Sequence, residues 1–138
     1  MSKYRAKKDT RMLGKELYEF DSKLEASQFD ILVIQLKNNE IEELIVQPRF
    51  ELLPTCTVKT NATKSGKSKQ SPITYVSDFS YLKDGKKIVV DVKGISLPVF
   101  NLKKKMFLQK LNEFGIDEFH LVFRDKTIKY IATKEATK

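Results

Sequence analysis

The sequence predicts an α/β (α+β) fold, with a mixed β-sheet of four to five strands flanked by helices in the order αβββαβ. Three observations predict it: a capped segment of helical period after residue 21, a β-hairpin centred on Asp84-Gly85, and a second helical segment followed by an apolar strand. With 138 residues, 41% of them hydrophobic, the chain can bury a single core. We expect one domain over residues 16–132, a basic N-terminal arm over 1–15 and a C-terminal tail over 133–138.

The first helix is predicted from about Ser22 to Lys37. Ser22-Lys23-Leu24-Glu25 is a capping-box pattern, in which the first residue caps the helix and the fourth is its partner. Apolar residues then recur at helical spacing: Leu24, Phe29, Leu32, Val33 and Leu36. Two short apolar runs follow, over 41–46 and 50–53. Gln47-Pro48-Arg49 between them indicates an interrupted or bent strand.

A hairpin is predicted next, because Asp84-Gly85 between two β-branched runs is a strong signal for a tight turn. Its strands run over 73–82 and 87–93. Ser96 and Pro98 indicate the start of a second helix, which helical spacing extends over 99–114 until Gly115. Strands over 118–123 and 127–132 complete the sheet. The connection from the hairpin through this helix to the next strand should be a right-handed crossover between parallel strands.

The formal charge of +8 is concentrated in two segments. Residues 1–15 carry six basic residues against one acid, and the loop over 55–72 carries four lysines and no acid. Both have the composition of mobile arms or loops, which suits a polyanion such as DNA; the alternative is that they only keep the chain in solution. The basic residues that we expect to contact nucleic acid, including two at the start of the second helix, are Lys3, Arg5, Lys7, Lys8, Arg11, Lys59, Lys64, Lys67, Lys69, Lys103 and Lys104. For the helix lysines, an ordinary polar face is an equally good interpretation.

The hairpin register places two acids side by side. If Asp84-Gly85 is a two-residue loop, Asp78 lies opposite Asp91, and alternation puts Lys93 on the same face. Opposed carboxylates repel, and a hard divalent cation, Mg²⁺ or Mn²⁺, would compensate. Glu25 falls on the apolar side of the first helix and can join them. Alternatively, Glu25 is only the capping partner of Ser22, and the two aspartates lie on an exposed face balanced by lysines.

The order Glu25, Asp78, then Asp91-Val92-Lys93 resembles the PD-(D/E)XK nuclease superfamily. Gln47-Pro48 and the strand around Asp78 are similar to the endonuclease subunit of Tn7-type transposases. The chain also resembles a family of small phage and prophage proteins, through blocks at residues 20–26, 47–50 and 91–94. The resemblance covers about residues 1–110. The proline that precedes the first aspartate in that superfamily is replaced here by Ser77.

The resemblance implies a restriction-endonuclease-like sheet and a role for each matching residue. Asp78 and Asp91 would hold the metal together with the backbone carbonyl of Val92, and Glu25 would complete the shell directly or through water. Lys93 would orient or activate the attacking water, and Gln47 would lie at the margin of the site. The catalytic set is thus Glu25, Asp78, Asp91 and Lys93. Many junction-cleaving enzymes of this fold are dimers, so the resemblance is compatible with a homodimer.

We therefore expect a metal-dependent DNA endonuclease of phage origin, possessing the parts that phosphodiester hydrolysis needs and resembling a junction resolvase in recombination or replication. The alternative is a non-catalytic nucleic-acid-binding or protein-binding module that retained the nuclease fold. A single cysteine and the lack of a secretory signal or long apolar run predict a cytoplasmic protein, in the bacterial host if phage-encoded, with no membrane contact.

Overall fold

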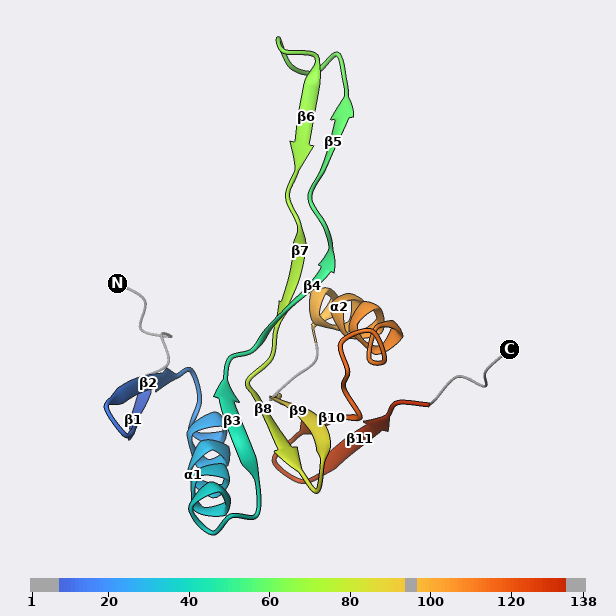
Figure 1. The fold of residues 1–138 in the computed structure, drawn as a ribbon. Helices are drawn as coiled ribbons and strands as arrows, with labels where there is room; N and C mark the ends of the chain where they lie inside the picture. Colours follow the sequence, from blue (N-terminus) through green and yellow to red (C-terminus); the bar gives the residue numbers. More distant parts are fainter. Residues whose placement is uncertain (1–7, 94–96, 134–138) are drawn as a thin grey trace.

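A computed structural model describes residues 8–93 and 97–133 and contains a five-stranded mixed sheet (Figure 1). The strand order is β11-β10-β9-β8-β3. Only the β9–β10 pair is parallel, and α2 connects these two strands. The predicted mixed α+β fold is confirmed. The strands are β3 (Glu42–Val46), β8 (Phe79–Lys83), β9 (Lys86–Val92), β10 (Glu118–Val122) and β11 (Thr127–Ile131).

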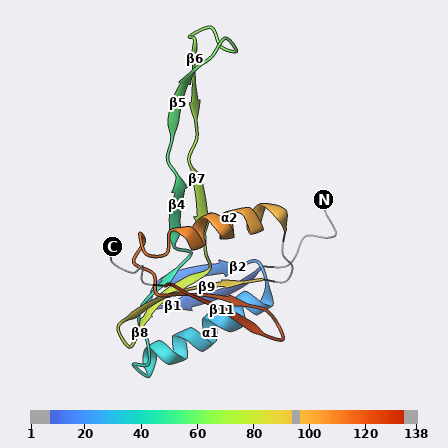
Figure 2. The same cartoon turned by 90° about the vertical axis from the view of Figure 1, so that its right-hand side faces the viewer.

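The two helices cover opposite faces of this sheet (Figure 2). Helix α1 (Lys23–Lys37) packs against Ile88, Val90 and Val92 of β9, whereas α2 (Pro98–Gln109) belongs to a second core cluster that contains Val89. This division follows from the alternation of side chains along a strand. Neither helix of the described residues has the length and hydropathy that a membrane span requires.

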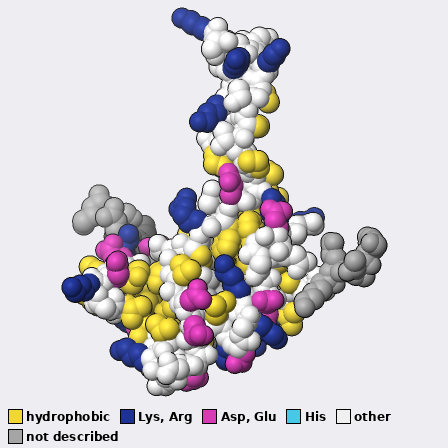
Figure 3. Space-filling model, viewed as in Figure 1, with side chains coloured by type: hydrophobic (Ala, Val, Ile, Leu, Met, Phe, Trp, Pro, Cys, Tyr) yellow, Lys and Arg dark blue, Asp and Glu magenta, His cyan; other side chains and the backbone are white. Residues whose placement is uncertain are grey.

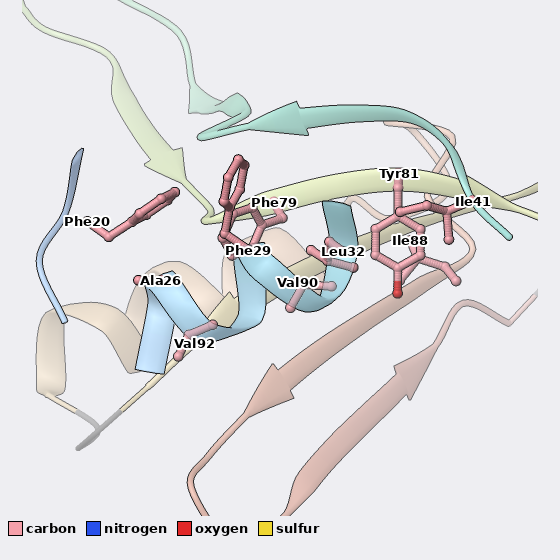
Figure 4. Packing of buried hydrophobic residues seen from close by; sticks show 10 residues of the cluster. All are labelled: Phe20, Ala26, Phe29, Leu32, Ile41, Phe79, Tyr81, Ile88, Val90 and Val92. Carbon is pink, nitrogen blue, oxygen red and sulfur yellow. The ribbon is translucent and has the colours of Figure 1, made fainter. Parts of the chain in front are cut away.

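Helix α1 begins as the capping box predicts. Ser22 is the N-cap, and its hydroxyl accepts a hydrogen bond from the backbone N–H of Glu25 at 3.1 Å. The buried face of α1 is formed by Ala26, Phe29 and Leu32. Figure 4 shows these side chains directed toward Phe79 and Val90 of the sheet. Burial of this apolar stripe fixes the helix against the sheet, so the position of Glu25 follows from the core.

Two pairings beyond the central sheet build a long projecting arm. Strand β4 (Arg49–Leu53) pairs with β7 (Ile73–Val76), and β5 (Cys56–Lys59) pairs with β6 (Lys67–Gln70). Together with the β3–β8 pair, they form one long, interrupted antiparallel ribbon that leaves the body of the molecule (Figure 1). We call residues 49–76 the β-arm. Of the two alternatives for 55–72, an arm or a loop, the loop needs correction at 56–59 and 67–70, which pair as strands.

The predicted strand over 73–82 is in fact two strands, β7 and β8, which pair with different partners. The break lies at Ser77-Asp78, opposite Gln47-Pro48. Ser77 N–H donates to Pro48 O at 3.0 Å, and Gln47 N–H donates to Asp78 O at 2.8 Å. Gln47 has a positive φ of 57°, which turns the chain at this point. The prediction of a bent strand at Gln47-Pro48 is confirmed, and the facing strand bends with it.

The N-terminal arm predicted over 1–15 is partly structured. Strand β1 (Asp9–Leu13) pairs with β2 (Glu16–Phe20) as a hairpin beside α1 (Figure 1). Phe20 is buried in the core next to α1, which anchors the hairpin. Residues 1–7 of the predicted arm, and 134–138 of the predicted tail, lie outside the described residues. The N-terminal arm prediction was therefore wrong for residues 9–13.

The second helix is shorter than predicted. It ends at Gln109, and Lys110 is its C-cap, whereas helical spacing extended it to Phe114. Turns occupy the next residues, yet Leu111 is buried and Phe114 packs against the same core. The apolar spacing continues beyond the helix because the side chains of these turns pack into the same core cluster as Phe107 of α2. Leu97 is the N-cap and makes no side-chain cap hydrogen bond; the predicted cap Ser96 lies outside the described residues.

The packing of Phe29 generates a stability prediction. Its ring lies 5.1 Å from that of Phe20 and 6.2 Å from that of Phe79, and the side chain is 1% exposed. Phe29→Ala should lower the free energy of unfolding by about 3–5 kcal/mol. Ile34→Ala on the same helix, where the side chain is 58% exposed, is the matched control and should cost far less. Denaturant unfolding measures both; equal losses would contradict this placement of the core.

Candidate active site

Asp78 lies where the β-arm meets the central sheet, one residue before β8. Its backbone N–H donates to Val90 O at 3.2 Å, so the ladder between β8 and β9 continues to this residue. Val92 lies beyond the last residue pair of that ladder, and its N–H donates instead to Oδ2 of Asp78 at 2.6 Å. The carboxyl therefore replaces a strand partner, which holds it at the end of the sheet.

Asp91 projects from β9 toward the opposite face from α1. It is 2% exposed, and its Oδ2 accepts a hydrogen bond from the hydroxyl of Tyr75 on β7. Lys93 Nζ lies 3.3 Å from the same oxygen and 3.9 Å from the centroid of the Phe100 ring on α2. The exposed-face alternative is therefore wrong for Asp91, although Lys93 does pair with Asp91 as that alternative supposed.

The register that brings the two aspartates together is the predicted one. Five residue pairs from Phe79–Val90 to Lys83–Lys86 have the expected partners, and the turn residues Asp84 and Gly85 both have positive φ, 52° and 78°. These angles define the tight turn whose twist matches that of the two strands. Asp78 and Asp91 stand one step beyond the last of these pairs.

Burial and the second carboxyl determine how Asp78 ionises. Burial raises its pKa to about 9, and the neighbouring Asp91 adds to the shift, while the hydrogen bond from Val92 opposes it. Burial also raises the pKa of Tyr75, so this phenol remains a neutral donor to Asp91. In the metal-free protein the pair therefore retains a proton on Asp78 at neutral pH, which avoids two adjacent buried charges.

Glu25 serves as the capping partner and also lies near the aspartates. Ser22 Oγ donates to its Oε1 at 3.2 Å. Burial raises the pKa of Glu25, and the charges of Asp21 and Asp91 raise it further, against the hydrogen bonds of Ser22 and Asp78. Glu25 belongs to α1, on the opposite side of the sheet from Asp91. The described residues contain no group of three His, Cys, Asp or Glu side chains that could share one metal ion.

The two aspartates fit a hard cation bound by two carboxylates. The hydrogen bonds from Tyr75 and Val92 and the ion pair from Lys93 end on Oδ2 of the two aspartates, and the two carboxyl groups also interact with each other. Mg²⁺ is usually held by one or two carboxylates, with water and substrate phosphate completing its shell. The carbonyl of Val92 points to the same strand edge as its N–H, toward Asp78. The oxygen donors of the two aspartates thus suit Mg²⁺ or Mn²⁺.

The other predicted residues fall into different environments. Gln47 lies beside Asp78 through its backbone, with an exposed side chain. Arg11 forms an exposed ion pair with Asp30 of α1 at 3.0 Å, and its contact with DNA stays a prediction. Lys103 Nζ donates to Thr74 O at 3.0 Å, and Lys104 Nζ lies 5.6 Å from the Tyr130 ring centroid. Lys8 and the four β-arm lysines are exposed. Lys3, Arg5 and Lys7 lie outside the described residues.

Sequence reasoning missed three residues at this site. Tyr75 reaches Asp91 across the bend between β7 and β8, and Phe100 of α2 contacts Lys93. Ser77, which stands in the place of a proline, is 1% exposed, and its hydroxyl donates to Val90 O at 2.7 Å. Ser77, which precedes Asp78, is thus hydrogen-bonded to Val90, which precedes Asp91. No local pattern marks Tyr75 or Phe100, because both meet the site through tertiary packing.

An open cavity of 580 Å³ lies beside the aspartates and is lined by Ser22, Lys93 and residues of the β10–β11 turn. The aspartates are not among its lining residues, but Lys93 contacts Asp91 and Ser22 contacts Glu25. Arg124 also lines it, with Asp125 nearby on the same turn. Lys93 therefore lines an open cavity, whereas Asp91 is buried.

The chain belongs to the family described as "Protein of unknown function (DUF1064)", whose model matches residues 1–133. No curated protein matches it. A solved structure described as "Crystal structure of SSO0001" is similar at 17% identity with a TM-score of 0.34, over 81% of this chain. The chain spans about half, 53%, of that protein's length.

The raised pKa of Asp78 predicts how the stability of the metal-free protein depends on pH. The folded state holds the proton up to about pH 9, whereas the unfolded chain releases it near ~4. The proton on Asp78 therefore contributes its full stabilisation below pH ~4, the pKa in the unfolded chain. This stabilisation is lost as the pH rises through about 9, the pKa in the folded protein. Asp78→Asn should therefore raise the melting temperature at pH 8.5 and flatten its decline between pH 5 and 9.

Calorimetry in the presence of a chelator measures this dependence. Asp125→Asn, at an exposed position, is the matched control and should keep the wild-type pH dependence. A wild-type profile as flat as that of Asp78→Asn would contradict the shared proton.

Proposed function

We propose that this protein is a Mg²⁺- or Mn²⁺-dependent DNA endonuclease of the PD-(D/E)XK type, with a restriction-endonuclease-like sheet. The observation that supports it most is the adjacent pair of Asp78, which is partly buried, and Asp91, which is buried, with Lys93 on the same oxygen of Asp91 as Tyr75. Two carboxyls opposed at the end of adjacent strands weaken the fold unless a cation lies between them. A phage origin and a junction-resolving role are part of the same proposal.

Each residue of the site has a separate role in the proposed phosphodiester hydrolysis. Asp78 and Asp91 would hold the metal, with Val92 O and Glu25 contributing to its surroundings. When bound, the metal supplies a Lewis acid for the phosphoryl group and lowers the pKa of water. Tyr75 fixes Asp91 and prevents its rotation. Lys93, held between Asp91 and the Phe100 ring, presents a positive charge that stabilises the charge developing on the phosphate and orients the attacking water.

One observation favours the second candidate, a binding module that retained the fold. Among residues 8–93 and 97–133, no three acidic or other ligating side chains are arranged to share an ion. A module of this kind would bind DNA without cleaving it under any metal condition. A pure binder, however, has no need of an adjacent carboxyl pair, so the enzyme is the better-supported function.

Cleavage assays test the proposal directly. Labelled duplex, single-stranded, flap and four-way DNA would be incubated with Mg²⁺, Mn²⁺ or a chelator. We expect cleavage only with the divalent ions. Asp78→Asn, Asp91→Asn and Lys93→Ala should each lower the cleavage rate by at least about 100-fold, since the first two each remove a carboxylate that would hold the metal and the third removes the charge that acts on the phosphate. Binding measured in chelator should change by only a few fold.

Lys86→Ala is the matched control, because Lys86 is an exposed lysine at the other end of the same strand. It should cleave like the wild type, and the melting temperature of each variant verifies that it folds. Wild-type activity in Asp91→Asn, or no cleavage of any substrate by the wild type, would overturn the endonuclease proposal.

A further inference from the structure

The outer half of the β-arm has two chemically different faces. Thr57 pairs with Lys69 and Lys59 pairs with Lys67, whereas Cys56 pairs with Gln70 and Val58 with Ser68. Opposed residues share a face, and successive residues alternate between faces. Three lysines therefore lie on one face, and none lies on the other. We call Lys59, Lys67 and Lys69 the lysine face; Lys64 lies in the loop at the tip. Figure 3 shows basic side chains gathered at this end of the arm.

The lysine face is unfavourable for the isolated protein. Lys59 and Lys67 stand directly opposite each other, and like charges in such a pair destabilise a hairpin. Residues 55–72 contain no acid, and within the described residues none of these lysines forms an ion pair. The tip is nevertheless held by its own hydrogen bonds, from Thr60 N–H to Gly66 O at 3.0 Å and from Thr63 Oγ1 to Lys67 O at 2.8 Å. An ordered ribbon that concentrates uncompensated positive charge suits a polyanion.

The composition of this segment selects the kind of polyanion. Residues 55–72 contain no aromatic side chain, so they offer no platform on which the bases of a single strand could stack. They contain no arginine, the residue that most often reads guanine in the major groove. Lysines accompanied by Ser, Thr and Asn side chains are the donors that contact phosphate oxygens. The segment is therefore suited to the backbone of a duplex, irrespective of its sequence.

The reach of the arm matches the repeat of that duplex. From Arg49, next to the bend that carries Asp78, to Lys59 there are ten residue steps, about 33 Å of extended chain. One turn of B-DNA spans about 34 Å, or 10 base pairs. We propose that the lysine face binds the phosphate backbone of duplex DNA about one helical turn from the phosphate held at Asp78 and Asp91. The location of that second phosphate rests on the proposed function; the binding by the lysine face does not.

Binding in chelator at several salt concentrations tests the contact. The triple variant Lys59→Gln, Lys67→Gln and Lys69→Gln should lower the slope of log K against log salt by about 2.7 for a 24-base-pair duplex, because each lost phosphate contact removes about 0.9. Two controls are matched. Lys37→Gln, Lys83→Gln and Lys129→Gln remove the same charge from the body, and Ser68→Ala with Gln70→Ala alters the other face of the arm. Both should keep the wild-type slope.

The length of the duplex tests the distance. Wild-type affinity should rise steeply between 8 and 16 base pairs, and the triple variant should lose most of that rise. An unchanged slope in the triple variant, equal binding of single strands, or equal competition by polyglutamate would overturn the inference. If the slope falls as expected but nothing is cleaved, the proposed endonuclease function fails and the inference stands. If DNA is cleaved but the slope is unchanged, the inference about the lysine face fails and the proposed endonuclease function stands.

Discussion

The adjacent carboxyls of Asp78, partly buried, and Asp91, buried, constrain this end of the molecule, because two such groups cannot both ionise side by side without a cation. The protein meets this constraint in the metal-free state by keeping a proton on Asp78, whose pKa burial raises to about 9. Oδ2 of Asp78 accepts a hydrogen bond from Val92 N–H. Oδ2 of Asp91 accepts a hydrogen bond from the Tyr75 hydroxyl and lies next to the positive charge of Lys93. The carboxyl oxygens form a site that suits a hard cation, so the cost of the pair is the strongest argument for a metal.

The long ribbon bends away from the central sheet next to Asp78. At Ser77-Asp78 one side of the ribbon leaves the central sheet, and at Gln47-Pro48 the other side leaves with it. The hydrogen bond from Ser77 to Val90 secures this bend beside Asp91. The carboxyl pair and the base of the β-arm are therefore built from one segment. A duplex bound along the lysine face would consequently be placed in a defined relation to the aspartates.

Sequence reasoning succeeded where local rules determine the structure. Asp84-Gly85 dictates a tight turn and therefore the register that places Asp78 beside Asp91, and Ser22 dictates the start of α1. It failed where tertiary packing overrides composition. The lysine-rich strands β5 and β6 have the composition of a loop, and they pair because the ribbon continues from β4 and β7. The contact of Tyr75 with Asp91 crosses a bend and has no signature in either segment.

The most direct test of the central claim is the number of protons released when Mn²⁺ binds. Titration calorimetry at pH 7, in two buffers of different ionisation enthalpy, measures this number. If the metal binds at the carboxyl pair, it displaces the proton held by Asp78, so about one proton should be released by the wild type. Asp78→Asn should release none and bind more weakly. Absence of saturable binding, or the same proton release and affinity in Asp78→Asn, would contradict a metal site at Asp78 and Asp91.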